Sequence, residues 1–209
     1  MKILLTGFEP FGGETVNPAW EAVCRVHAPD GVTLSTLQIP TVFGLAGERV
    51  LDAVRRERPD AVLCLGQAAG RAALTPERVA INLRDASLPD NAGNQPEDEP
   101  IVSGGPAAYF STLPVKAMVR AIREAGLPAV VSCSAGTFVC NDLLYMLLSA
   151  LAETERPIPA GFLHLPCLPE QAASRGDGTP SLPLGDLVRG VEAALGAIAV
   201  WLPEREDTK

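Results

Sequence analysis

The sequence lacks the features that would place it in a membrane or on nucleic acid. No apolar run reaches the roughly 18 residues that a transmembrane helix needs. MKILLTGFEP, at the N-terminus, has too short an apolar stretch for a signal peptide. Acidic residues outnumber basic ones, so the formal net charge is −8 at pH 7, and such a chain is repelled by phosphate backbones and anionic lipid. We therefore expect a cytoplasmic protein that binds neither nucleic acid nor membrane.

Histidine and cysteine are scarce, which limits the available chemistry. The two histidines are His27 and His164, so a reaction that needs an imidazole has two candidates. Five cysteines, at positions 24, 64, 133, 140 and 167, are odd in number and widely scattered, which predicts free thiols rather than a disulfide framework. Cys133, Cys140, His164 and Cys167 could ligate zinc by residue type, but their spacing matches no common zinc pattern.

The chain does contain a repeated alternation of predicted strands and helices. Its 209 residues, 47% of them hydrophobic, are enough to bury one sizeable core. Strands are expected at 2–6, 32–39, 61–65, 79–83, 129–131 and 162–165, and helices at 19–26, 43–56, 117–124, 140–151 and 186–201. This order predicts a single α/β domain over 1–209, with three αβα layers, a mostly parallel twisted sheet, helices on both faces, and a charged tail from about residue 203.

Four loops that follow predicted strands hold the reactive or unusual residues. They read GFEPFGG, GQAAGR, SAGTFVCN and HLPCLPE. In open parallel sheets, sites lie in the loops beyond the carboxyl ends of the strands, so we expect these loops to converge at one end of the sheet. Residues 85–106, rich in Pro, Asp, Asn and Gly, form a long loop, which predicts a functional or mobile segment.

Taken alone, the cysteines and histidines each allow a structural interpretation. Cys140 lies near a helix start, where the positive helix end would stabilise a thiolate and free N–H groups could form an oxyanion hole, but it could equally be a small core hydrophobe. His164 lies among apolar neighbours and could be a hydrogen-bonded core residue. Cys133 ends a predicted strand, and His27 could cap the C-terminus of a helix.

Glu77 and the N-terminal loop are ambiguous in the same way. The segment TPE at 75–77 fits the first turn of a helix, but the residues after it alternate like a strand, and a carboxylate at a strand start could orient a histidine. Phe8 and Phe11 could form an apolar wall for a flat ligand, or simply pack within their loop.

Together these segments resemble the pyroglutamyl peptidase I family of cysteine peptidases. LLTGFEPFGG followed by Asn17–Pro18 is similar to the family's N-terminus, and GQAAGRAALTPERVAIN to its glutamate signature. PDNAGNQP resembles the central loop, SCSAGTFVCND the cysteine signature, and GFLHLPCLPEQ the histidine segment. The matches follow the family's order from about residue 1 to 171.

The resemblance implies a catalytic triad of Cys140, His164 and Glu77. Cys140 would be the nucleophile, His164 the residue that moves its proton, and Glu77 the carboxylate that orients the imidazole. The implied reaction removes an N-terminal pyroglutamyl (5-oxoprolyl) residue from a peptide through a thioester acyl-enzyme, with no metal or other cofactor.

The resemblance also implies how the substrate is held. Phe8 and Phe11 would pack on the flat lactam ring, while Asn17 and Gln67 would form hydrogen bonds with it or hold the loops. Family members are often homotetramers, so a homo-oligomer is expected.

Two positions depart from the family's pattern. Ser87 stands where an arginine is frequent, and Cys167 stands where a bulkier aromatic residue is common. Cys133, Cys167 and His27 are expected to be structural. Two alternatives remain open: a family member that only binds lactams or peptide ends, and a cysteine-triad amidase that accepts unblocked substrates.

Overall fold

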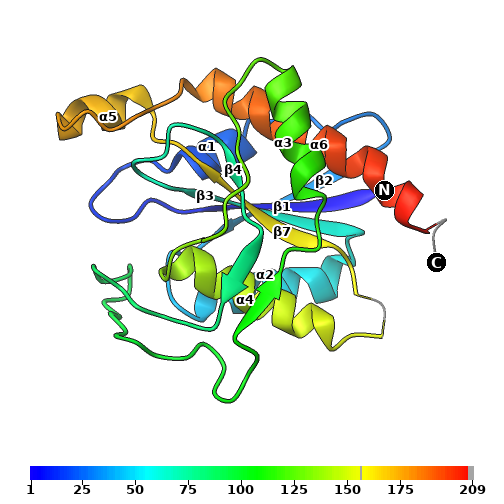
Figure 1. Ribbon diagram of the computed structural model, residues 1–209, viewed down its shortest axis with the longest axis horizontal. Coiled ribbons are helices and arrows are strands. Elements are labelled where there is room, and N and C mark those ends of the chain that lie inside the picture. The colour runs from blue at the N-terminus through cyan, green and yellow to red at the C-terminus, as the bar shows by residue number, and fades with distance from the viewer. Residues whose placement is uncertain (156, 207–209) are drawn as a thin grey trace.

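The protein is built in three layers around a central sheet (Figure 1). A computed structural model describes residues 1–155 and 157–206. The five strands run in the order β2-β1-β3-β7-β4, with β1 parallel to β2 and β3, and β3 parallel to β7. Only the short edge strand β4 is antiparallel to its neighbour. The α/β class and the mostly parallel sheet predicted from the sequence are confirmed.

The sheet has four long strands and one short edge strand, β4. Its members are β1 (Lys2–Phe8), β2 (Thr33–Ile39), β3 (Ala61–Gln67), β4 (Thr75–Pro76) and β7 (Ala160–Leu165). Every residue of β3 and β7 is buried, because helices cover both faces of these central strands. A separate two-stranded ribbon pairs β5 (Val79–Ile81) with β6 (Ala108–Phe110).

Helices cover the two faces of the sheet in separate groups. One face carries α1 (Pro18–Val23), α3 (Val115–Glu124) and α6 (Leu184–Glu206), and the other carries α2 (Leu45–Glu57) and α4 (Val139–Ala152) (Figure 1). The short helix α5 (Pro169–Arg175) follows β7. No helix in the described part of the chain is long and apolar enough to cross a membrane.

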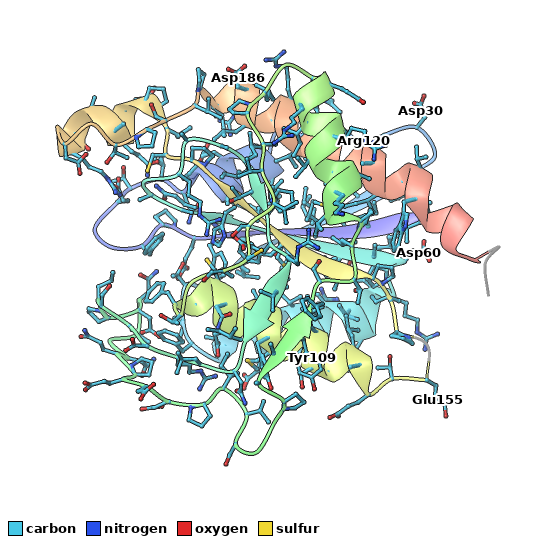
Figure 2. The ribbon with its side chains drawn as sticks, viewed as in Figure 1. Asp30, Asp60, Tyr109, Arg120, Glu155 and Asp186 are labelled. Atoms are coloured by element: carbon cyan, nitrogen blue, oxygen red, sulfur yellow. The ribbon has the colours of Figure 1, made fainter. Side chains whose placement is uncertain are left out.

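Alternation along the strands divides the core into two hydrophobic clusters. Ile3 and Leu5 of β1 pack toward α1, α3 and α6, whereas Leu4 packs toward α2 and α4. This follows from the two-residue period of a strand, which turns successive side chains to opposite faces. In the second cluster, Tyr109 of β6 (Figure 2) lies against Tyr145 of α4 with ring centroids 5.2 Å apart, which joins the ribbon to the helical layer.

Some expected elements differ from the structure at their ends. Residues 129–131 do not form a regular strand, because β4 beside them is only two residues long and the segment makes only isolated bridges, Leu74 with Ala129 and Glu77 with Ser132. Helix α6 continues to Glu206, beyond the expected end at 201, and so includes the first residues of the expected charged tail; residues 207–209 lie outside the described chain.

The helix-cap interpretation of His27 is wrong. Helix α1 ends at Val23 and is capped by Cys24, so His27 lies beyond it. Its side chain is 91% exposed, and Nδ1 lies 2.9 Å from Glu192 Oε1 on α6. His27 is therefore a surface residue that links two elements. Asn17 caps α1: its Oδ1 accepts from the Ala19 N–H at 3.0 Å, and Pro18 takes the first helical position.

Gly7 sets how closely α1 approaches β1, and this generates a stability prediction. A Cβ at Gly7 would lie 2.9 Å from Trp20 N and 3.0 Å from Ala19 C, which are backbone atoms that cannot rotate away. We expect Gly7→Ala to lower the free energy of unfolding by about 1–3 kcal/mol, as overpacking does. Chemical denaturation would measure it, and a variant as stable as the parent protein would contradict it.

A matched control is Gly196→Ala in α6, where a Cβ would have no neighbour within 4 Å. Because alanine favours the helix over glycine, this variant should raise the free energy of unfolding by about 0.5–1 kcal/mol.

Candidate active site

A cavity of about 270 Å³ lies at the carboxyl ends of β1, β3 and β7. The expected loops do meet there, because parallel strands end at the same edge of a sheet. Six of the seven residues singled out from the sequence line the cavity: Phe8, Phe11, Asn17, Gln67, Cys140 and His164. The seventh, Glu77, lies behind His164 and is fully buried.

Strand pairing places Glu77 against His164. The residues of β4 pair antiparallel with β7, with Thr75 opposite His164, and the Glu77 N–H donates to Phe162 O at 2.9 Å. Glu77 Oε1 then lies 2.7 Å from His164 Nδ1. The segment TPE is therefore the edge strand and its continuation, and the helix-start alternative is wrong.

Burial and mutual charge set the protonation of this pair. Burial favours the neutral acid of Glu77, but the His164 hydrogen bond and the charges around the carboxyl outweigh it and lower the pKa of Glu77. For His164, burial dominates and lowers the pKa, although the bond to Glu77 works in the opposite direction. At neutral pH the pair is thus a carboxylate and a neutral imidazole. An ionised Glu77 accepts a hydrogen bond from the Nδ1–H of His164, which leaves Nε2 unprotonated and free to act as a base.

Arg71 is a residue of the site that the sequence analysis did not single out. Its Nη1 lies 2.5 Å from Glu77 Oε1 and also donates to Thr75, and its Nη2 donates to Ser134 O at 2.8 Å. It therefore balances the buried charge of Glu77 and ties β4 to the segment before α4. GQAAGR was one of the loops singled out, but only the structure shows that its arginine lies beside a buried carboxylate, which needs a cation.

Cys140 lies in the first turn of α4, partly exposed to the cavity. Its sulfur faces Gly66, where an added Cβ would lie 3.0 Å from Sγ, so a glycine is needed for the thiol to fit. Burial, and then the charge of Glu77, raise the pKa of the Cys140 thiol to about 12, with Arg71 offsetting part of this. Desolvation therefore opposes the thiolate that the positive end of the helix would favour.

Aromatic rings form the wall of the cavity opposite Gln67 and Arg71. Phe11 packs on Phe138, with ring centroids 6.0 Å apart, and Phe138 also contacts Phe43 edge-on at 5.3 Å. Phe8 lies 6.3 Å from Phe162 beneath the cavity. Phe138 was missed from the sequence, although it stands two positions before Cys140.

The two predicted amides are largely committed to protein partners. Asn17 caps α1 and donates from Nδ2 to Glu9 O at 3.0 Å, so it holds the N-terminal loop. Gln67 Nε2 donates to Gln171 Oε1 at 3.1 Å, and Cys167 Sγ lies 3.2 Å from the same nitrogen. Cys167 is buried in this contact. The side-chain oxygen of Gln67, Oε1, has no hydrogen-bond partner within the described residues.

The long loop 85–106 is anchored beside the cavity by two residues of PDNAGNQP. The Asp90 carboxylate accepts from the N–H groups of Phe43, Ala92 and Asn94. Asn91 Nδ2 donates to Glu9 Oε1 at 2.8 Å and to Pro10 O at 2.9 Å, so it binds the loop that carries Phe11. The long loop therefore helps to hold the N-terminal loop in position.

The remaining cysteines do not join Cys140 and His164. All five thiols are free. Cys133 is exposed and faces a neighbouring groove rather than the cavity. Within residues 1–155 and 157–206, no three His, Cys, Asp or Glu side chains are grouped as metal ligands, so the zinc alternative has no support in the geometry. Ser87 is exposed on the long loop.

Comparison with known proteins gives a consistent set of relatives. Residues 1–200 match the family model described as pyroglutamyl peptidase. A pyrrolidone-carboxylate peptidase of Levilactobacillus brevis is 58% identical over 96% of this chain and 98% of its own, and one of Streptomyces coelicolor is 52% identical over 100% and 96%. The crystal structure of pyroglutamyl peptidase I from Bacillus amyloliquefaciens superposes with a TM-score of 0.91, at 48% identity over 95% of each chain.

The raised pKa of Cys140 generates a prediction about its reactivity. Because the thiol is neutral at pH 7, its rate of alkylation by iodoacetamide should rise about tenfold per pH unit between about pH 6 and 9. Peptide mapping by mass spectrometry would follow Cys140 separately from the exposed Cys24. A rate that levels off near pH 7 would instead indicate a preformed thiolate–imidazolium pair.

Proposed function

This chain belongs to the pyroglutamyl peptidase family, and we propose that it removes an N-terminal pyroglutamyl residue from peptides by a Cys140–His164–Glu77 triad. The observation that carries the proposal is the 2.7 Å contact of His164 Nδ1 with a buried Glu77, in a cavity that His164 shares with Cys140. A nucleophile, a base and a group that orients the base are the parts that acyl transfer requires.

The first half-reaction forms a thioester. His164 Nε2 takes the Cys140 proton as the sulfur attacks the carbonyl between pyroglutamate and the next residue, so proton transfer accompanies attack and no thiolate is stored beforehand. The resulting imidazolium protonates the leaving amine. In the second half-reaction, water loses a proton to His164 and attacks the thioester, which releases pyroglutamate and restores the thiol. None of these steps requires a metal.

Glu77 and Arg71 support the imidazole through both half-reactions. Glu77 accepts a hydrogen bond from Nδ1–H, keeps Nε2 facing the thiol and stabilises the imidazolium as it forms. Arg71, 28% exposed, prevents the fully buried carboxylate from being an unpaired charge. It is a positioning residue that acts through Glu77.

The start of α4 supplies donors for the tetrahedral oxyanion. The N–H groups of Val139 and Cys140 have no backbone acceptor in the described chain, since the first N–H groups of a helix lack an intrahelical partner. Together with the helix dipole they would stabilise negative charge beside Cys140.

A neutral lactam suits the walls of the cavity. Phe8, Phe11 and Phe138 offer apolar faces, and the free Gln67 carbonyl oxygen can accept the lactam N–H. An unblocked N-terminal glutamate would bring an ammonium into this site, and the cavity lining carries no carboxylate to pair with it. The cavity should therefore favour an N-terminal pyroglutamyl residue over an unblocked glutamate.

We extend the proposal to a cytoplasmic homotetramer, which the family resemblance implies. Phe110 on β6 is 71% exposed, and a large exposed aromatic residue suits burial between subunits. We expect light scattering to give a mass about four times that of the 21.9 kDa chain. A mass equal to one chain would contradict this part of the proposal.

Turnover of small amides tests the activity itself. Pyroglutamyl, glutamyl and prolyl amides of one fluorescent amine should be compared in reductant with a chelator present. We expect release from the pyroglutamyl amide alone, and a loss of at least about 10³-fold in Cys140→Ser, because a serine hydroxyl is a far weaker nucleophile at neutral pH. Binding without release would favour a lactam-binding protein, and equal turnover of all three would favour a broader amidase.

Removing the charge of Glu77 tests the triad. Glu77→Gln should lower kcat by about 10²–10⁴-fold with a small change in KM, because the amide no longer selects the Nδ1–H tautomer. Glu192→Gln is the matched control, since Glu192 contacts His27 Nδ1 at 2.9 Å on the surface away from the cavity. Equal kcat in the two variants would remove Glu77 from the mechanism.

A further inference from the structure

A second groove adjoins the candidate active site. It has a volume of about 540 Å³ and is more open than the catalytic cavity. Its lining comes from two segments: Arg71, Ala72, Ala73 and Thr75 from one, and Val130, Ser132, Cys133 and Ser134 from the other. Apart from Arg71 and its bonds to Thr75 and Ser134, the proposed catalytic mechanism uses no residue of this lining.

The groove and the catalytic cavity share two segments of chain. Residues 68–71 and 135–136 line the cavity, and residues 71–75 and 132–134 line the groove. Arg71 lines both and bridges the two segments, since its Nη1 contacts Glu77 and its Nη2 donates to Ser134 O. The two hollows therefore adjoin at Arg71.

The order of strands places the cavity and the groove relative to each other. Thr41 and Phe8, at the carboxyl ends of β2 and β1, line one side of the cavity, and His164 on β7 follows. Thr75 on β4, the next strand along the sheet, lies in the groove. Moving across the sheet, one passes from the aromatic wall to His164 and then past Arg71 into the groove.

Building on the proposed peptidase function, we propose that this groove binds the leaving part of the peptide, beyond the residue that follows pyroglutamate. The aromatic wall encloses the lactam side, whereas the amine that His164 protonates carries a chain that must extend away from that wall. The groove beyond Arg71 adjoins the cavity and is large enough for a short extended segment.

The lining defines which peptides fit. Ala72, Ala73 and Val130, which is 47% exposed, present an apolar surface. The Nε–H of Arg71 and the second N–H of its Nη2 have no acceptor among the described residues, and these two groups can donate to peptide carbonyls. Because Arg71 is the charged residue of the lining, apolar segments are favoured and basic ones are disfavoured.

The first test compares peptides that differ only beyond the first leaving residue. Pyroglutamyl-Ala-amide ends at the junction, whereas pyroglutamyl-Ala-Leu-Val-amide and pyroglutamyl-Ala-Lys-Lys-amide reach the groove. In the parent protein the apolar peptide should have a kcat/KM about tenfold above that of the basic one.

Val130→Asp should lower kcat/KM for the apolar peptide about tenfold through KM, with the short amide changed by less than about twofold. Val200→Asp is the matched control, because Val200 is 68% exposed on α6 and lines neither hollow. Ala72→Asp, on the other segment of the groove, should repeat the result if Val130→Asp is poorly folded.

Cys133 provides a second readout that does not depend on turnover. In Cys140→Ala, the apolar peptide should slow alkylation of Cys133 in the groove, the short amide should not, and the exposed Cys24 should be unaffected by either.

The outcomes separate this proposal from the peptidase function. One set of results would overturn the groove proposal alone. The parent protein would cleave the short amide, Val130→Asp and Val200→Asp would have the same kcat/KM for the apolar peptide, and that peptide would not slow the alkylation of Cys133. Failure of the parent protein to cleave any of the three peptides overturns the peptidase function and the groove with it.

Discussion

The hydrogen bond between Glu77 and His164 is the contact on which the arrangement of the site depends. A fully buried carboxylate is costly unless cations and hydrogen bonds compensate it, and here His164 and Arg71 do so on the same oxygen. The two-residue strand β4 fixes this geometry. Its antiparallel pairing with β7 sets Thr75 opposite His164 and so places the carboxylate of Glu77 beside the imidazole. A one-residue shift of register would turn Glu77 to the other face of the strand.

Arg71 links this contact to the rest of the site. Its guanidinium donates to Glu77 and to the carbonyl oxygen of Ser134, and these bonds tie the loop after β3 to the segment before α4. The N-terminal loop is fixed from the opposite direction, where Asn17 and Asn91 bind the backbone at Glu9 and Pro10. The cavity is thus bounded by loops that are bonded to one another as well as to their own strands.

Desolvation shifts the pKa values of His164 and Cys140 in opposite directions and favours the neutral form of each group. It lowers the pKa of His164 and raises that of the Cys140 thiol. In the proposed mechanism, the neutral imidazole would act as the base that removes the thiol proton. The same low-dielectric surroundings would strengthen the field of the α4 N-terminus on the oxyanion. The charges of the resting site are then mainly those of the Glu77–Arg71 pair.

Sequence alone determined the class of fold and the residues of interest. The uninterrupted apolar runs Ile3–Leu5 and Ala61–Leu65 predict strands that are buried on both faces, as in a parallel sheet. The motifs around Glu77, Cys140 and His164 carry the family resemblance. Local pattern could not decide whether TPE begins a helix or a strand, nor recognise Arg71, Phe138 or Asp90, because their tasks arise from partners distant in the chain. The protonation of Cys140 was likewise decided by tertiary structure, since a helix end predicts a thiolate and only the packing around the sulfur shows that burial is the stronger effect.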